Sequence, residues 1–153
     1  MNTLFDPIRI GDIDLATRIC MAPLTRNRAS PGQLPNDLMR QYYEQRADPA
    51  TGAGLIITEA SQICAMGQGY LDTPGIHTPA QVAAWRRITQ AVHARGGRIV
   101  IQLWHVGRIS YVSLLPGGQA LVSSTARAAR SKTFIAGGFA DCSPPRALRS
   151  DEI

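Results

Sequence analysis

The amino-acid sequence predicts an α/β fold built on parallel strands. Three apolar runs, each followed by small or polar residues, are separated by two segments with helical spacing of apolar residues; the runs occupy residues 18–26, 54–60 and 98–105. Strands and helices in this alternating order form a parallel sheet with right-handed crossovers. Because the carboxyl ends of parallel strands lie at one edge of a sheet, we expect the ends of these runs to converge and to carry any binding groups.

A β-hairpin is predicted ahead of the first run. Residues 5–15 alternate apolar and polar side chains around Gly11-Asp12, and glycine readily adopts the positive φ that a two-residue hairpin turn requires. The strand that follows must end at Pro23, because proline has no N–H to donate to a central sheet.

Both segments between the runs carry helix start signals. Asn36 can cap a helix that extends to about Arg46. Thr78 can cap a second helix, with Pro79 at its first position, which ends at about Arg95 before a Gly-Gly pair. The stripes that we expect to pack on the sheet are Leu38, Met39, Tyr42 and Tyr43 in the first helix and Val82, Trp85, Ile88 and Val92 in the second.

Composition excludes several classes of protein. The chain has 44% hydrophobic and 18% charged residues, as is typical of a globular protein, and no apolar run approaches the roughly 20 residues of a membrane span. The amino terminus also lacks the features of a signal peptide, so we expect a cytoplasmic location and no membrane partner. Cys20, Cys64 and Cys142 are too far apart to indicate a zinc site or a disulfide framework, and we expect no metal.

The net charge of +5 does not indicate a nucleic-acid partner. The basic residues are scattered, and the closest approach to a cluster is Arg127, Arg130 and Lys132. A nucleic-acid-binding module would combine such residues with interleaved aromatic side chains on a recognisable framework. We interpret this basic segment as a solvated loop and expect no nucleic acid to bind.

Regular patterns weaken after Val106. We expect an irregular excursion over residues 119–143, with room for a hairpin. Ser150 and the two acidic residues after it then have the character of a helix amino terminus. We therefore expect residues 1–153 to be the amino-terminal portion of a larger domain, truncated at the start of a helix near Ser150.

Five short strings occur in order along the chain: Met21-Ala22-Pro23-Leu24-Thr25-Arg26, Ile56-Ile57-Thr58-Glu59-Ala60, Gly69-Tyr70, Gln102-Leu103-Trp104-His105 and Gly107-Arg108-Ile109-Ser110. Together they resemble the old yellow enzyme family, which comprises FMN-dependent NAD(P)H:flavin oxidoreductases, many of them ene-reductases, on a (β/α)8 TIM barrel. The resemblance implies an incomplete barrel here, made of the amino-terminal hairpin and about the first three βα units. The 153 residues agree, since a complete barrel needs roughly 250.

The resemblance implies an FMN-binding site made by Pro23, Thr25, Ala60 and Gln102. The amide of Gln102 offers both a donor and an acceptor, as the pyrimidine edge of a flavin requires, and Thr25 offers a hydroxyl for the flavin O4 region. Pro23 and Ala60 would contact the flat ring through the main chain. From the residues alone, an ordinary strand-end role for Gln102 and a capping role for Thr25 stay open.

By the same resemblance, Tyr70 and Trp104 line the substrate pocket. An isolated aromatic residue more often simply packs in the core or on the surface, and this alternative also stays open. We interpret Glu59 as structural, and likewise His77 and His105, because neither histidine has a visible partner in the sequence.

Two positions depart from the family pattern. Tyr111 and Leu121 stand where the family more often has His and Pro, respectively. We expect this difference to affect the local loop geometry only.

The implied reaction passes a hydride from NADPH or NADH through the flavin to the alkene of an α,β-unsaturated carbonyl compound, a small-molecule substrate. The resemblance places the substrate-activating His/Asn or His/His pair, the proton-donating Tyr and the phosphate site beyond this chain, so we expect no catalytic residue within it. Two hypotheses stay open. The chain is the amino-terminal part of an ene-reductase, or it is non-catalytic, either as an inert truncated product or as a half-barrel that requires a complementary chain.

Overall fold

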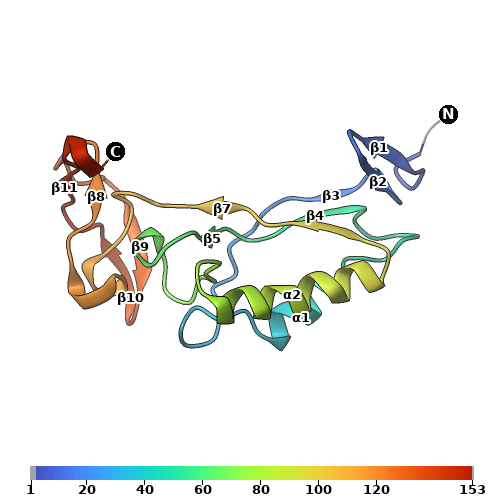
Figure 1. The fold of residues 1–153 in the computed structure, drawn as a ribbon, viewed down its shortest axis with the longest axis horizontal. Helices are drawn as coiled ribbons and strands as arrows, with labels where there is room; N and C mark the ends of the chain where they lie inside the picture. Colours follow the sequence, from blue (N-terminus) through green and yellow to red (C-terminus); the bar gives the residue numbers. More distant parts are fainter. Residues whose placement is uncertain (1–2, 153) are drawn as a thin grey trace.

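The computed structural model describes residues 3–152 and begins with the predicted hairpin. Strands β1 (Ile8–Ile10) and β2 (Ile13–Leu15) pair antiparallel, with Ile10 opposite Ile13. Gly11 occupies the turn with a φ of 58°, a conformation that glycine adopts without the steric penalty of a Cβ. The hairpin lies at the amino-terminal end of the sheet (Figure 1).

A three-stranded parallel sheet forms the centre of the fold. Its strands lie in the order β3-β4-β6, and Met21, Ile56 and Ile99 are aligned across it. One helix connects each pair of neighbouring strands, and both helices lie on the same side of the sheet (Figure 1). The predicted βαβαβ order is therefore confirmed. The bounds are β3 (Cys20–Met21), α1 (Asp37–Glu44), β4 (Leu55–Ile57), α2 (Pro79–Ala94) and β6 (Arg98–Val100).

The third predicted strand is divided in two, and the second ends early and is followed by a further short strand beyond the predicted run. After β4 and β6 the chain continues into β5 (Ser61–Gln62) and β7 (Leu103–Trp104), which form a separate parallel pair. The interruption has a local cause at Thr58, whose hydroxyl oxygen accepts the N–H of Gln102 over 3.3 Å. A side-chain acceptor thus replaces a main-chain acceptor at the point where the ladder breaks.

The predicted helix caps are confirmed. The side chain of Asn36 accepts the N–H of Met39 over 3.1 Å. At the start of α2, the Thr78 hydroxyl accepts the N–H of Gln81 and the Gln81 side chain accepts the N–H of Thr78, which is a reciprocal capping box. Both helices end within two residues of the predicted positions, which is the usual uncertainty of helix ends.

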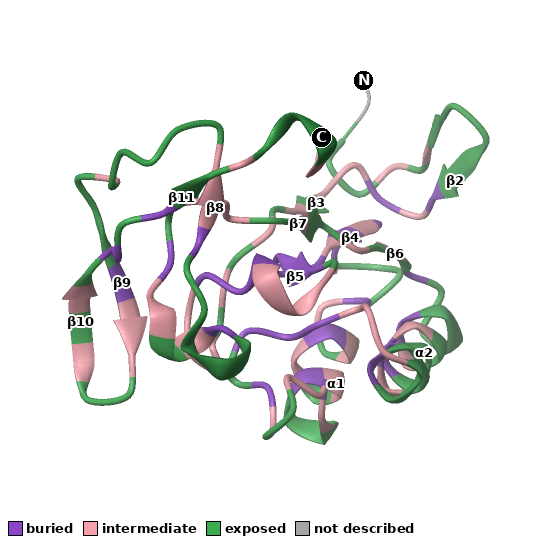
Figure 2. Ribbon diagram, turned by 60° about the vertical axis from the view of Figure 1, so that its left-hand side comes forward, coloured by how far each residue is buried: buried purple, intermediate pink, exposed green. Residues whose placement is uncertain are grey.

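The hydrophobic core lies between the helices and the sheet. Figure 2 shows buried positions on the inward faces of α1 and α2 and along β5, whereas β3, β6 and β7 are mostly half-buried or exposed. The opposite face of the sheet carries no helix among residues 3–152. The buried core residues are Ala29, Met39, Tyr43, Ala47, Ala53, Ile56, Trp85, Ile88 and Val92.

Two residues of the predicted stripes do not face the core. Val82 is 41% exposed and Leu38 is 58% exposed. On α2 the inward position is taken by Gln81, which is buried because its side chain bonds the N–H groups of His77 and Thr78 and the carbonyl of Gly32. On α1, Leu38 lies one position before Met39, which takes the inward face.

The excursion after β7 contains the hairpin that the sequence left room for. Strands β9 (Lys132–Ile135) and β10 (Gly138–Asp141) pair antiparallel. Strands β8 (Val122–Ser123) and β11 (Arg146–Ala147) form a short parallel pair beside them. Where a helix start was predicted, the structure has a 3-10 turn at Ser150–Glu152, so the described chain has three central strands but only two α-helices.

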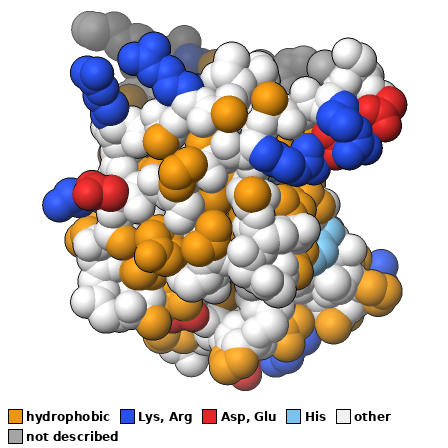
Figure 3. Space-filling view, turned by 90° about the vertical axis from the view of Figure 1, so that its left-hand side faces the viewer, with side chains coloured by type: hydrophobic (Ala, Val, Ile, Leu, Met, Phe, Trp, Pro, Cys, Tyr) orange, Lys and Arg blue, Asp and Glu red, His pale blue; other side chains and the backbone are white. Residues whose placement is uncertain are grey.

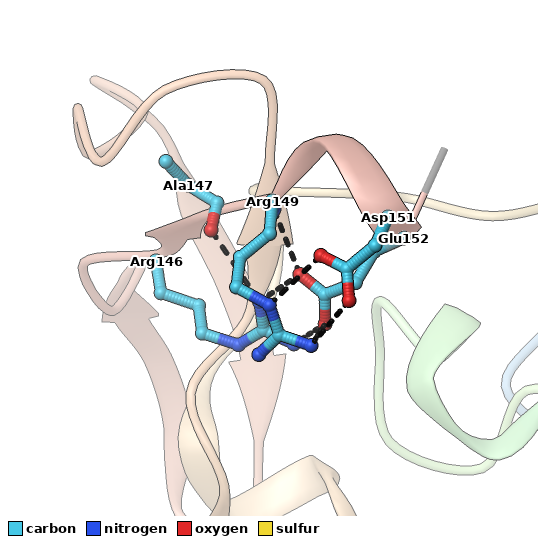
Figure 4. Close-up of polar contacts among 5 residues, drawn as sticks. All are labelled: Arg146, Ala147, Arg149, Asp151 and Glu152. Carbon is cyan, nitrogen blue, oxygen red and sulfur yellow. Dashed lines mark hydrogen bonds and ion pairs between the residues drawn. The ribbon is translucent and has the colours of Figure 1, made fainter.

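Ion pairs hold this last turn. Both terminal nitrogens of the Arg146 guanidinium donate to the Glu152 carboxylate over 2.7 Å, and Arg149 donates to Asp151 over 3.0 and 3.1 Å (Figure 4). The N–H of Arg149 also donates to Glu152. The bonds to Glu152 lower the pKa of its carboxyl to about 2, and the bond from Arg146 has the largest effect.

Neither helix within residues 3–152 has both the length and the apolar character needed to cross a membrane.

Replacing Trp85 with alanine tests the packing of α2. Trp85 is 1% exposed and its indole N–H donates to the carbonyl of Gly75, so we expect the free energy of unfolding to fall by about 3–5 kcal/mol. Val82→Ala, on the outward side of the same helix, is the matched control and should change it by about 0.5 kcal/mol or less. Urea unfolding followed by circular dichroism measures both, and similar losses for the two variants would show that the inward face is wrongly assigned.

The pKa of Glu152 can be measured by NMR titration of its carboxyl carbon. Because the folded pKa lies below the ordinary value of 4.5, the ion pairs stabilise the turn above pH 4.5 and are lost as the pH falls towards about 2. We expect a midpoint near 2, and a shift back towards the ordinary value in Arg146→Gln. A midpoint near 4.5 in the unmodified chain would contradict this arrangement.

Candidate functional site

The ends of the three central strands converge at one edge of the sheet, as predicted. The segment after β3 joins the end of β4, because the N–H of Arg26 donates to the carboxylate of Glu59 over 3.0 Å. The segment after β4 joins the end of β6, because the N–H of Ser61 donates to the carbonyl of Gln102 over 2.9 Å. Thr25, Ala60 and Gln102 therefore lie on adjacent segments at the carboxyl edge.

A cleft of about 620 Å³ opens beside the segment that follows β3. It brings Pro23 and Thr25 together with Tyr70, which joins one predicted substrate-pocket residue to two predicted cofactor-binding residues. Figure 3 views the molecule from this end, where hydrophobic side chains gather across the middle of the face and Lys and Arg side chains stand at its upper edge. The cleft is lined by Pro23, Leu24, Thr25, Arg26, Asn27, Tyr70, Lys132, Phe134 and Phe139.

Gln102 combines a fixed main chain with a free side chain. Its N–H donates to the Thr58 hydroxyl and its carbonyl accepts the N–H of Ser61, so both main-chain groups are held. Its side chain is exposed and makes no hydrogen bond to any residue in the 3–152 range. A side-chain amide with free donor and acceptor atoms on a fixed main chain fits the mixed edge of a flavin ring, although Gln102 is not among the residues that line the cleft.

Thr25 is open to a ligand at the cleft, whereas Ala60 is buried. The Thr25 hydroxyl is half-buried at the cleft and, within the described part of the chain, has no hydrogen-bond partner. Ala60 carries only a methyl group, but it is 4% exposed, so little of its surface is open in this structure. The free hydroxyl of Thr25 and the free amide of Gln102 are the groups that fit the ring of FMN.

Tyr70 and Trp104 lie in contact, with ring centroids 6.0 Å apart and planes tilted by 43°. The indole N–H of Trp104 points to the side-chain oxygen of Gln62 over 3.4 Å, and the carbonyl of Tyr70 accepts a hydrogen bond from Gln68. The structure thus brings the two predicted pocket residues together, with Tyr70 in the cleft wall and Trp104 beside it.

Glu59 is the central buried polar group of the site. Its side chain is completely buried, it accepts hydrogen bonds from the Tyr43 hydroxyl (3.3 Å) and the Arg26 N–H (3.0 Å), and its own N–H donates to the Tyr43 oxygen (2.9 Å). Burial raises the pKa of the Glu59 carboxyl, against the hydrogen bonds that favour the charged form. Burial, followed by the Glu59 charge, raises the pKa of the Tyr43 hydroxyl. The structural interpretation of Glu59 is confirmed by these contacts.

The hairpin β9–β10 contributes a cleft wall that sequence analysis missed. Phe134 and Phe139 lie with ring centroids 5.4 Å apart, and both line the cleft together with Lys132. The hairpin is attached to the segment before Tyr70, because the Thr133 hydroxyl donates to the carbonyl of Gly69. The sequence signal was the Gly137-Gly138 pair between two short runs that each contain a phenylalanine, which suggests a hairpin but not where it docks.

Both histidines with predicted structural roles make local contacts. The ring of His77 lies 3.4 Å from the side-chain oxygen of Gln33, and Nδ1 of His105 accepts the N–H of Gly107. Of the two positions that differ from the family pattern, Leu121 is buried and Tyr111 is half-buried. Across residues 3–152, no group of three His, Cys, Asp or Glu side chains is placed to hold a metal ion.

Comparison with known proteins identifies the fold and the family. The NADH:flavin oxidoreductase / NADH oxidase family matches residues 3–152. The chain is 47% identical, over its whole length, to a chanoclavine-I aldehyde reductase from Penicillium roqueforti and covers 39% of that protein. It is 44% identical to 12-oxophytodienoate reductase 1 from Oryza sativa subsp. japonica, with 98% of this chain and 37% of that protein aligned.

Two solved structures resemble the chain over almost its full length. The structure of morphinone reductase in complex with tetrahydroNAD has a TM-score of 0.88 and 46% identity, covering 99% of this chain and 42% of that one. An old yellow enzyme homologue from Zymomonas mobilis has a TM-score of 0.89 and 45% identity, covering 99% of this chain and 41% of that one. The chain therefore spans about two-fifths of the length of its relatives. It belongs to the NADH:flavin oxidoreductase / NADH oxidase family, the old yellow enzymes, and has the fold of the amino-terminal part of that family's (β/α)8 barrel.

Proposed function

We propose that residues 1–153 form the amino-terminal portion of the FMN-binding barrel of an ene-reductase and supply the contacts to the flavin ring. The observation that carries this proposal is the convergence of three strand ends. It sets the free hydroxyl of Thr25 and the free amide of Gln102 at one edge of the sheet, beside a cleft that contains Tyr70.

When bound, FMN supplies hydride transfer from NADPH or NADH to an activated alkene. The Gln102 amide donates to and accepts from the polar edge of the ring, since it has both kinds of group free. The Thr25 hydroxyl donates to a ring carbonyl and stabilises negative charge there. Pro23 and Ala60 hold the flat ring through the main chain, because neither side chain extends far from the backbone.

The substrate proposed is a small molecule with an α,β-unsaturated carbonyl group. Two relatives are named as an aldehyde reductase and a 12-oxophytodienoate reductase. Tyr70 and Trp104 form an aromatic pair that suits an apolar substrate, and Phe134 and Phe139 add two further rings to the lining of the cleft. A cytoplasmic location is proposed as well, supported by free thiols at Cys20, Cys64 and Cys142.

Turnover is proposed to require the remaining barrel strands, in the same chain or in a complementary one. Within residues 3–152, β3 and β6 each pair on one edge only, and apolar side chains such as Val100 and Leu103 are exposed. An open sheet edge readily pairs with another strand. The same observations favour the second candidate function, a half-barrel that is inactive by itself.

Purified alone, the 153-residue chain is expected to bind FMN weakly and to show no NAD(P)H-dependent reduction of enones. The phosphate site of a (β/α)8 barrel commonly lies after its last two strands. Losing several charge-assisted hydrogen bonds of about 1.5–3 kcal/mol each weakens binding by several powers of ten. Adding a chain that supplies the remaining strands should restore both yellow colour and turnover. Stable colour and turnover by the 153-residue chain alone would contradict its status as an incomplete enzyme.

Gln102→Leu tests the ring contact in the chain combined with the remaining strands. We expect the Kd for FMN to rise about tenfold to a hundredfold, because the leucine neither donates nor accepts and leaves ring atoms without partners. Gln90→Leu is the matched control, since Gln90 is exposed on α2, away from the carboxyl edge. Fluorescence titration of FMN measures both values, and equal affinities for the two variants would show that Gln102 does not bind the ring.

A further inference from the structure

The backbone that follows Thr25 is held by a buried carboxylate. The N–H of Arg26 donates to Oε2 of Glu59 over 3.0 Å, and Oε1 of the same carboxylate accepts the hydroxyl of Tyr43 over 3.3 Å. The hydroxyl oxygen of Tyr43 in turn accepts the N–H of Glu59 over 2.9 Å. One acidic side chain therefore links the segment after β3, the end of β4 and helix α1.

Thr25 has no anchor of its own. Among residues 3–152, neither its main chain nor its hydroxyl makes a hydrogen bond. The next two residues are both held, Arg26 by Glu59 and Asn27 by a bond from its side chain to the carbonyl of Leu71 over 2.8 Å. Asn27 also has a φ of 52°, which turns the chain sharply at this point. The position of Thr25 is therefore set by its neighbours along the chain, β3 before it and the two anchored residues after it.

A carboxylate suits this position better than any neutral group. Glu59 must accept from an N–H and from an O–H at the same time, and an ionised carboxylate presents only acceptors. A glutamine of nearly the same size would set its NH2 group against one of the two donors. Burial opposes the charge and raises the pKa of this carboxyl, while the bonds to both oxygens and the nearby Arg26 guanidinium favour the ionised form.

We propose that Glu59 is a positioning residue of the flavin site: by holding the Arg26 N–H, it sets where the Thr25 hydroxyl stands in the cleft. The proposal rests on the function proposed above, in which Thr25 binds the flavin ring. Because Glu59 directly precedes Ala60, the same side chain also ties together two of the segments that contact the ring. Its effect on flavin passes through Thr25 and not through a contact of its own.

Amide hydrogen exchange of Arg26, followed by NMR in the 153-residue chain, tests the first step. We expect the unmodified amide to be protected and Glu59→Gln to raise its exchange rate about tenfold to a hundredfold, because a bond to a charged acceptor is lost. Glu44→Gln is the matched control: Glu44 lies on α1, pairs with Arg40 and Arg95, and should leave the Arg26 amide unchanged. An unprotected Arg26 amide, or equal rates in the two variants, overturns the proposal.

The exchange rates of core amides distinguish a positioning role of Glu59 from a role in overall stability alone. Glu59→Gln should leave the exchange of the buried Val92 amide unchanged, and a uniform rise across the chain overturns the positioning role. If Glu59→Gln does not fold, Tyr43→Phe provides the second variant, because it keeps the carboxylate and removes the hydroxyl that donates to Oε1 and accepts the Glu59 N–H. We expect it to raise the Arg26 exchange rate by less than tenfold, and no change in that rate overturns the role.

A double-mutant cycle on FMN affinity tests the second step. In the chain combined with the remaining barrel strands, Glu59→Gln, Thr25→Val and the double variant are titrated with FMN. If Glu59 acts through Thr25, the double variant should bind about as weakly as the weaker single variant, whereas simple additivity overturns the proposal. Failure of the unmodified assembly to bind FMN would contradict the proposed function, while the exchange rate of Arg26 would still decide whether Glu59 holds this backbone.

Discussion

The parallel register of β3, β4 and β6 is the constraint on which the rest of the structure depends. With Met21, Ile56 and Ile99 aligned across the sheet, the chain leaves all three strands at the same edge. A slip of one residue would reverse which side chains face the helices. Glu59 would then lose Tyr43 on α1, and the segment that carries Thr25 would lose its link to the end of β4. The register thus determines both the core and the candidate site.

The two faces of this sheet have different environments. Ile99 and Ile101 pack against the core beneath the helices, whereas the intervening Val100 is exposed on the other face. Strands that are buried on both faces are typical of parallel sheets in barrels. The apolar residues on the uncovered face therefore agree with the short span of this chain relative to its relatives, in which further strands complete the barrel. The candidate flavin site lies at the edge of this open structure.

Local signals in the sequence predicted most of the fold that positions the site. Apolar runs ending in polar residues identified the three strand ends, and the capping box at Thr78 identified the residue at which α2 begins. Periodicity alone could not show that Gln81 takes an inward position in place of Val82, because that depends on bonds to His77 and Gly32 that form only in the fold. The break between β4 and β5 likewise depends on the Thr58 hydroxyl.

Part of the candidate site could also be predicted from local signals. A strand precedes each of Pro23, Thr25, Ala60 and Gln102, so their convergence could be predicted from the order of the sequence. The hairpin wall of the cleft was not, because Thr133 reaches a carbonyl acceptor 64 positions earlier in the chain. The contact of each residue with a flavin stays a prediction, since the order of the sequence gives the place of a residue in the fold and not the atom that it binds.

A crystal structure of the chain combined with the remaining barrel strands and FMN tests the central claim most directly. We expect the flavin ring at the carboxyl edge of the sheet, with the Thr25 hydroxyl and the Gln102 amide at hydrogen-bond distance, about 3 Å, from its polar atoms. A ring bound elsewhere would contradict the claim that the three strand ends form the flavin site. The smaller pocket of about 220 Å³ beside α1, lined in part by Arg28 and Gln41, is one such place.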